Sequence, residues 1–116
     1  MADFTIEKKN FDMRELIIKL SEQFKLKSID NRNFNKLQLV AEEYLNNILF
    51  PNFDGAVEIS IVNDDKGLSL NFTHEGINYM NKITNNNFLS LKILDNKTEK
   101  IESSAKDGFT SIKFIF

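Results

Sequence analysis

The sequence predicts an α+β fold: a two-layer α/β sandwich with a mostly antiparallel sheet and helices on one face. Apolar residues recur with helical spacing in two stretches before Pro51, and they alternate with polar residues after Gly55. The chain has 116 residues, of which 41% are hydrophobic. That is enough for one core and leaves little room for a second, so we expect a single domain over residues 1–116.

The first predicted helix covers residues 13–26 and follows a short candidate strand at residues 4–9. Asp12 stands at its N-cap position, and Glu15 three residues later completes the pattern of a capping box. Its apolar positions share one helix face: Met13, Leu16, Ile17, Leu20 and Phe24.

The second predicted helix covers residues 34–50 and ends before Pro51. At about 100° per residue, Glu43 and Asn47 lie on one side of it, beside the apolar stripe. A carboxylate and an amide offer hard oxygen ligands, which could hold magnesium and activate a water or a hydroxyl. The alternative is that they are ordinary polar residues at the border of a buried face. The stripe consists of Phe34, Leu37, Ala41, Tyr44, Leu45 and Ile48.

The second half of the chain predicts two hairpins with a helix between them. "AVEISIV" and "GLSLNF" alternate around the turn "NDDKG", and "EKIESS" and "FTSIKFIF" flank "AKDG". Between the hairpins, Phe88, Leu91 and Leu94 predict a third helix after a polar loop. We expect these residues to be buried in the core: Leu16, Leu20, Leu37, Ala41, Tyr44, Ile48, Ile59, Ile61, Leu70, Phe72 and Phe114.

Composition excludes several classes of function. The net charge of −2 comes from 15 basic and 17 acidic residues and lacks the basic footprint of a nucleic-acid binder. There is no cysteine and a single histidine, which excludes thiolate and multi-histidine metal sites. The N-terminus lacks the apolar core of a signal peptide, and no apolar run approaches the length of a membrane span. We therefore expect a cytoplasmic protein without nucleic-acid or membrane partners.

The segment "FNKLQLVAEEYLNNILF" resembles the helix that carries Glu-x-x-x-Asn in the histidine-kinase-like ATPase superfamily (the Bergerat fold). The order of elements over residues 11–116 is similar to the branch of that superfamily formed by anti-sigma factors that are serine kinases. The resemblance implies that Asn47 ligates the magnesium that bridges the nucleotide phosphates, and that Glu43 is the general base.

Two further segments extend the resemblance to nucleotide binding. "VEISIVNDDKGLSLNFTHEGIN" resembles the hairpin that ends in the Asp-x-Gly adenine motif, which implies an adenine-binding role for His74 and Gly76. "NNNFLSLKIL" occupies the place of the glycine-rich phosphate loop, with Asn87, Phe88 and Ser90 where glycines belong.

These substitutions predict that ATP and magnesium bind weakly or not at all. His74 replaces an aspartate, and a neutral imidazole offers a single acceptor nitrogen. Glu75 could replace it only if the strand slipped by one residue. The side chain of Phe88 would obstruct the close approach of backbone to phosphate. The alternative for His74 is a hydrogen-bonded structural residue.

The sequence is compatible with three functions. The first is a regulatory protein resembling an anti-sigma factor, which binds a sigma factor or an anti-anti-sigma protein and has lost or weakened its ATP site. The second is an active ATP-dependent serine protein kinase that uses Glu43 and Asn47 with magnesium. The third is an unrelated α+β domain with a small ligand between helices and sheet. The family resemblance also implies a homodimer formed through the sheet or its first strand.

Overall fold

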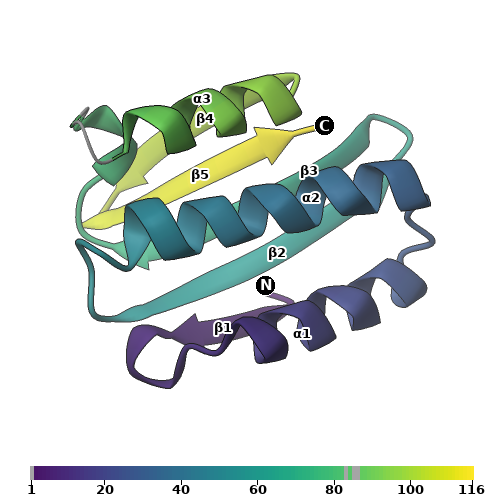
Figure 1. The fold of residues 1–116 in the computed structure, drawn as a ribbon, viewed down its shortest axis with the longest axis horizontal. Coiled ribbons are helices and arrows are strands. Elements are labelled where there is room, and N and C mark those ends of the chain that lie inside the picture. Colours follow the sequence, from purple (N-terminus) through teal and green to yellow (C-terminus); the bar gives the residue numbers. More distant parts are fainter. Residues whose placement is uncertain (1, 83, 85–86) are drawn as a thin grey trace.

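The computed structural model describes residues 2–82, 84 and 87–116. Within these residues the strands form one sheet in the order β1-β2-β3-β5-β4, and every neighbouring pair is antiparallel (Figure 1). The strands are β1 (Phe4–Glu7), β2 (Ala56–Asp64), β3 (Gly67–Glu75), β4 (Lys100–Lys106) and β5 (Phe109–Ile115).

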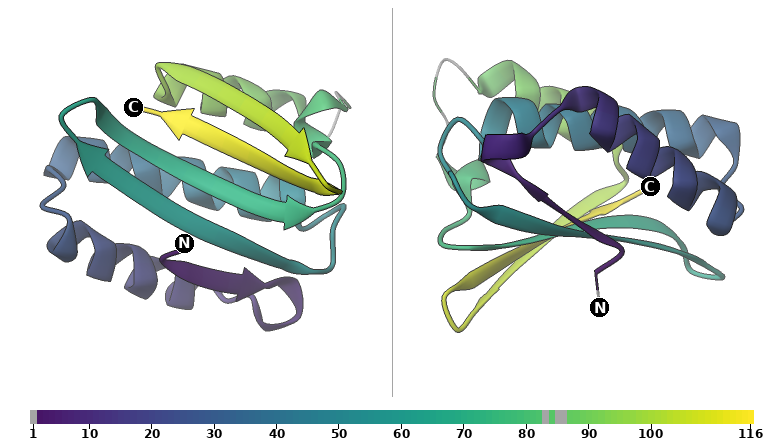
Figure 2. Two further views of the ribbon diagram at one scale, coloured as in Figure 1. Left: turned by 180° about the vertical axis from the view of Figure 1, so that it is seen from behind. Right: turned by 90° about the horizontal axis from the view of Figure 1, so that it is seen from below.

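The helices lie together on one face of this sheet, and the opposite face is uncovered in the described part of the chain (Figure 2). The helix α2 crosses the middle of the sheet, α1 lies beside β1, and α3 lies on the side of β4 and β5 (Figure 1). The predicted two-layer α+β sandwich is therefore confirmed. The helical segments are α1 (Met13–Leu26), α2 (Asn31–Glu43), the π-helical η2 (Tyr44–Leu49) and α3 (Phe88–Lys97), with short 3₁₀ turns η1 (Lys8–Asn10) and η3 (Tyr79–Asn81).

The first helix occupies the predicted residues, but the second begins earlier than predicted. Asp12 caps α1 by accepting a hydrogen bond of 2.9 Å from the backbone of Arg14. The start predicted at residue 34 is wrong, because Asp30 caps α2 with a 2.9 Å bond from the backbone of Asn33. A short polar side chain at this position satisfies an otherwise unpaired N–H group of the first turn.

The end of the second helix also differs from a regular α-helix. From Tyr44 to Leu49 the turns widen to π geometry, and the N–H of Phe50 donates to the carbonyl of Leu45 at 3.0 Å. Four residues of this segment are buried in the core, and so is Phe50 directly after it; the four are Tyr44, Leu45, Ile48 and Leu49. Asn46 and Asn47 are exposed.

The core lies between the helices and the covered face of the sheet. All eleven residues predicted to be buried are buried. At its centre the rings of Tyr44, Phe72 and Phe114 contact one another, with centroids 4.7 to 5.9 Å apart. Aromatic pairs at such separations contribute beyond the area that they bury.

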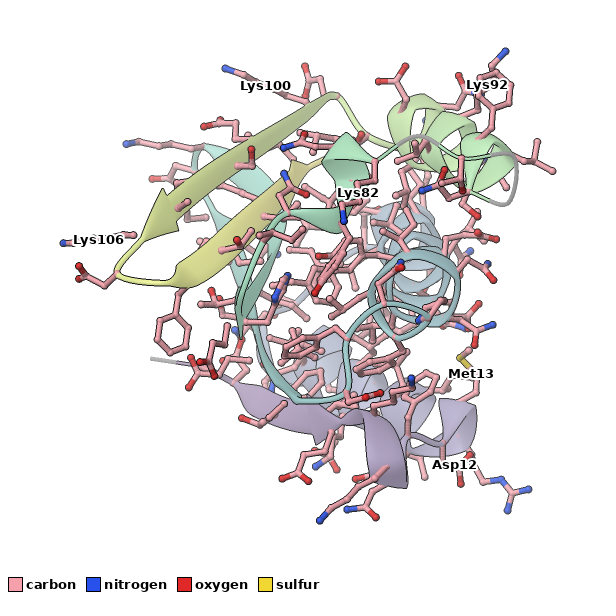
Figure 3. All side chains as sticks on the ribbon, turned by 90° about the vertical axis from the view of Figure 1, so that its left-hand side faces the viewer. Asp12, Met13, Lys82, Lys92, Lys100 and Lys106 are labelled. Carbon is pink, nitrogen blue, oxygen red and sulfur yellow. The ribbon has the colours of Figure 1, made fainter. Side chains whose placement is uncertain are left out.

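The third helix forms where predicted, but Phe88 is not on its buried side. Ser90 and Leu94 face the core, whereas 52% of Phe88 is exposed. Phe88 precedes Leu94 by six residues, which turns it about 120° away around the helix axis. The amine of Lys92 lies 5.0 Å from the centre of the Phe88 ring, on the outer surface of α3 (Figure 3).

Both predicted hairpins are present, and each ends in turn chemistry that the sequence supplies. Between β4 and β5, Asp107 and Gly108 have φ values of 54° and 83°. Two successive residues with positive φ make the tight turn whose twist matches antiparallel strands, and Asp-Gly is a favoured pair for it.

Candidate functional site

Glu43 and Asn47 lie together at the junction of α2 and the π-helical segment. The amide Nδ2 of Asn47 donates to the carboxylate Oε2 of Glu43 at 2.8 Å. Asn47 is exposed and Glu43 is half-buried, so this hydrogen bond is made at the surface. Segments of π-helix within α-helices occur frequently at functional sites.

This pair supplies an incomplete set of ligands for a metal. A carboxylate and an amide oxygen could meet a magnesium ion, which usually keeps several waters and takes its remaining ligands from substrate phosphates. In residues 2–82, 84 and 87–116, no group of three or more metal-ligating His, Cys, Asp or Glu side chains comes together. A magnesium ion at Glu43 and Asn47 would therefore depend on a bound phosphate.

His74 lies near the end of β3 and faces the helix layer, with only 1% of its surface exposed. Its Nδ1 is 2.9 Å from the carbonyl oxygen of Glu75, and its Nε2 is 3.4 Å from the hydroxyl of Tyr44. A carbonyl can only accept, so Nδ1 carries a proton, and in the neutral ring Nε2 then accepts from the tyrosine. Both ring nitrogens are thus engaged within the protein.

Aromatic rings enclose the imidazole of His74. Phe53 lies 5.0 Å from it, and Tyr79 stacks on it at 6.0 Å with 20° between the ring planes. Glu75, the alternative adenine acceptor, is exposed on the next position of β3 and faces the opposite side of the sheet. The register of the strands therefore selects His74, and not Glu75, for the helix side.

Tyr44 is fixed in its protonated form. Burial raises the pKa of its hydroxyl well above its usual range, and the nearby hydroxyl of Tyr79 raises it further. Desolvation disfavours the phenolate. Tyr44 therefore keeps the hydroxyl hydrogen that it can donate to Nε2 of a neutral His74 at ordinary pH.

Gly76 closes the pairing of β3 with β5. Its N–H donates to the carbonyl of Gly108 at 2.8 Å, and its own carbonyl accepts from the hydroxyl of Thr110 at 2.6 Å. Its φ of 98° is a conformation that favours glycine. These contacts give Gly76 a structural role at the end of the strand.

Two hollows flank this end of the sheet. The first, of about 350 Å³, lies between the segment after β3 and strand β4, and is lined by Gly76, Asn78, Asn81 and Ser103 among others. The second, of about 450 Å³, has His74, Phe53, Glu58 and Glu75 in its lining. Neither of these two hollows is lined by Glu43 or Asn47.

At the expected phosphate loop, the side chain of Asn87 holds the backbone before α3. Its Oδ1 accepts from the N–H of Thr84 at 2.8 Å, and its Nδ2 donates to the carbonyl of Lys82 at 2.6 Å. Its φ is −110°, so it does not adopt a glycine-like conformation. Ser90 is 7% exposed on the inner side of α3. Residues 85 and 86 of the same predicted loop lie outside the described residues.

Sequence reasoning missed three residues around His74: Tyr44, Phe53 and Tyr79. The helical period places Tyr44 correctly in the apolar stripe but gives no hydrogen-bond partner for its hydroxyl. A buried tyrosine hydroxyl usually has a hydrogen-bond partner, so the polar tip of Tyr44 was the available signal. Nothing in the spacing of Phe53 or Tyr79 indicates contact with His74.

No protein-family model matches this chain, and no curated protein matches it. None of the helices in residues 2–82, 84 and 87–116 combines the length and the apolar character needed to cross a membrane.

Proposed function

We propose that this protein is a cytoplasmic regulatory protein that resembles an anti-sigma factor and acts by binding another protein, with a lost or weakened ATP site. Its partner is a sigma factor or an anti-anti-sigma protein. The layer of helices on one face of an antiparallel sheet supports the resemblance to the histidine-kinase-like ATPase superfamily. The contacts of His74 support the loss of nucleotide binding, and they are the main evidence for this proposal.

The adenine position is filled by the protein itself. In the superfamily, an aspartate there would accept from the adenine amino group. Here His74 donates to the Glu75 carbonyl and accepts from Tyr44, and it is 1% exposed. An adenine would have to break these bonds and separate the ring from Phe53 or Tyr79. Buried polar groups left without partners are costly, so such an exchange is unfavourable.

The phosphate position is also unfavourable. Phosphate binding at a helix start needs free backbone N–H groups that a ligand can approach closely. The backbone N–H groups of Asn87 and Phe88 both donate to the carbonyl of Thr84, at 3.3 and 3.1 Å, and the bulky Phe88 is the first residue of α3. Without bound phosphates, a magnesium ion beside Glu43 and Asn47 would keep its waters.

A second candidate function is the active serine protein kinase. The 2.8 Å contact between Asn47 and Glu43 and the π-helical segment after Glu43 favour it. In that function Glu43 would be the general base and Asn47 would ligate magnesium. The two functions differ in one measurable quantity, the affinity for Mg-ATP.

Titration calorimetry with Mg-ATP separates these two functions. We expect a dissociation constant above roughly 0.1 mM, equivalent to less than about 5.5 kcal/mol of binding. Asn47→Ala should behave like the wild type, as should Asn46→Ala, which changes an exposed neighbour outside the pair. Micromolar binding that disappears in Asn47→Ala but persists in Asn46→Ala would establish the kinase and contradict the proposal.

Binding to a sigma factor or an anti-anti-sigma protein can be tested separately. Sigma factors and anti-anti-sigma proteins encoded in the same genome can be purified and mixed with this protein in the absence of nucleotide. We expect one of them to form a complex that co-elutes in gel filtration. If none of them binds with or without Mg-ATP, the anti-sigma proposal is wrong.

A further inference from the structure

Strand β4 forms one edge of the sheet, and within the described residues no strand covers its outer side. All of its residues are exposed except Ile101, which is half-buried. Figure 3 shows Lys100 and Lys106 towards the two ends of this strand, both directed away from the body of the protein. An exposed edge offers unpaired backbone groups to another strand.

The hydrogen-bond pattern identifies which backbone groups of β4 face outward. Gly108 and Phe116, the residues on either side of β5, form hydrogen bonds with Gly76 and Leu68 on the side of β3, so the even-numbered residues of β5 face β3. In an antiparallel sheet this pattern alternates, so the odd-numbered residues of β5 face β4. Their opposite residues in β4 are 100, 102, 104 and 106. The N–H and C=O groups of Ile101, Ser103 and Ala105 therefore point to the free edge.

We propose that β4 pairs antiparallel with β4 of a second copy of this chain, so that the two sheets become one. The two-fold axis passes beside Ser104, which lies opposite Ser104 of the partner subunit. Ser103 then exchanges backbone hydrogen bonds with the partner's Ala105, and Ala105 with the partner's Ser103. Glu102 lies opposite the partner's Lys106, and Lys106 opposite the partner's Glu102.

Charge selects this register over its neighbours. Glu102, Ser104 and Lys106 share the uncovered face of the sheet, and opposite charges placed directly across an antiparallel pair stabilise it. An axis at Ser103 would place Lys100 opposite the partner's Lys106 twice. An axis at Glu102 would place Glu102 opposite the partner's Glu102. Like charges at these positions are destabilising. An axis at Ile101 would place Lys100 opposite the partner's Glu102, but only residues 100–102 of the two strands would then overlap. The axis at Ser104 forms two ion pairs of opposite sign and pairs residues 102–106 of both strands.

The helix side of the edge leaves room for the second strand. Ser103 and Ala105 are small, exposed, and line the 350 Å³ hollow. The other edge of the sheet is less suited, because β1 has only four residues, whereas β4 has seven. A longer edge provides more backbone hydrogen bonds.

The dimer goes beyond the proposed function and requires neither nucleotide nor a regulatory partner. Its interface is small, so we expect weak association at the low end of specific interfaces. Its ion pairs are at the surface, so salt should weaken it further.

Sedimentation of the full chain over a range of concentrations, at low and high salt, tests this inference. We expect the wild type to shift from monomer to dimer as concentration rises at low salt. Glu102→Lys and Lys106→Glu should each weaken association about tenfold or more, since each puts like charges opposite at two places. Both changes are at exposed side chains, and circular dichroism would verify that the fold is retained.

Two rescue experiments make the test specific to this register. The double variant Glu102→Lys/Lys106→Glu exchanges both charges and should recover the dimer. An equimolar mixture of the two single variants should also associate, because each chain then carries one sign of charge at both positions. Lys25→Glu, at an exposed position of α1, makes the same charge change as Lys106→Glu and should leave association unchanged.

Three outcomes would overturn the inference. A monomer at every concentration shows that the edge does not self-associate. A dimer that neither single variant weakens uses another surface. Weakening without rescue in the double variant or in the mixture excludes the pairing of Glu102 with the partner's Lys106. Each of these outcomes leaves the results with Mg-ATP and sigma factors unaffected, so the two proposals fail independently.

Discussion

The two faces of the sheet differ in what their side chains contact, although the same strands form both. In β3, Leu70 is fully buried under the helices, whereas Asn71, the next residue, is half-buried on the uncovered face. The alternation follows from the pleat, which directs successive side chains to opposite sides. The difference shows that the covered face supplies most of the stability, while the uncovered face is available for contacts with other molecules.

Polar groups on the two faces also differ in their surroundings. On the covered face, Tyr44 and His74 satisfy each other across the helix–sheet interface at 3.4 Å. On the uncovered face, Thr73 and Ser111 contact each other at 3.0 Å but remain partly accessible to water. A buried polar group depends on its protein partner, whereas an accessible one can exchange that partner for water. Substitutions at the two kinds of position should therefore have unequal costs.

The largest effect is expected for large-to-small changes on the covered side. Leu37→Ala in α2 and Leu70→Ala in β3 should each lower the free energy of unfolding by about 2–5 kcal/mol, because both leucines are fully buried and leave a cavity. Urea unfolding measures this loss. A change below about 0.5 kcal/mol at Leu37 would contradict its place in the core.

The second largest loss of stability is expected when an ion pair between the end of α1 and the sheet is removed. The Oδ2 of Asp3 lies 2.6 Å from the amine of Lys27 and accepts from the N–H of Ile61 at 2.7 Å, with about a quarter of each charged side chain exposed. We expect Asp3→Ala to cost about 1.5–3 kcal/mol in urea unfolding, since hydrogen bonds to charged groups are the stronger ones.

A matched control for Asp3 is available at the surface. Asp54 pairs with Lys8 at 2.8 Å, but its side chain is 92% exposed. Asp54→Ala should therefore change stability by less than about 0.5 kcal/mol. Equal losses in the two variants would mean that burial does not set the strength of these ion pairs.

Tyr44→Phe removes the hydroxyl that bonds to His74. At neutral pH we expect a loss of about 0.5–1.5 kcal/mol, the usual contribution of one hydrogen bond. Burial raises the folded-state pKa of Tyr44 above the usual value of 10.0. The unfolded chain therefore loses this proton first, and the contribution that is fully present below about pH 10 declines as pH rises above it.

Unfolding of both proteins between pH 8 and 11 tests the sign of this effect. The wild type should lose up to about 1.4 kcal/mol per pH unit above pH 10 relative to Tyr44→Phe, so the stabilities of the two should converge and then cross. Parallel pH profiles would show that Tyr44 is not buried as a neutral hydroxyl.

The smallest effect is expected for Asn71→Ala on the uncovered face. It changes the residue next to Leu70 in the same strand, but it removes no core contact, so stability should change by less than about 0.5 kcal/mol. The ratio of the losses at Leu70 and Asn71 measures directly how unequal the two faces are. A loss at Asn71 as large as that at Leu70 would mean that something covers the second face in solution.

Much of the fold was predictable from the sequence because its signals are local. The caps, turns and hydrophobic periods located α1, both hairpins and the eleven core residues. The start of α2 at Asn31 could also have been predicted, since Asp30 is a favourable N-cap residue. The widening of the turns after Glu43 could not, because five buried residues from Tyr44 to Phe50 pack on a surface that other segments build.

The candidate site shows the same division. By itself the sequence determined that Glu43 and Asn47 share one side of a helix, and that His74 occupies the covered side of β3, because both follow from the fixed periods of helices and strands. Only the tertiary structure decided that His74 bonds to Tyr44, 30 positions away, and packs against Phe53 and Tyr79. Side-chain contacts between separate elements depend on how the layers pack, and no local period encodes that packing.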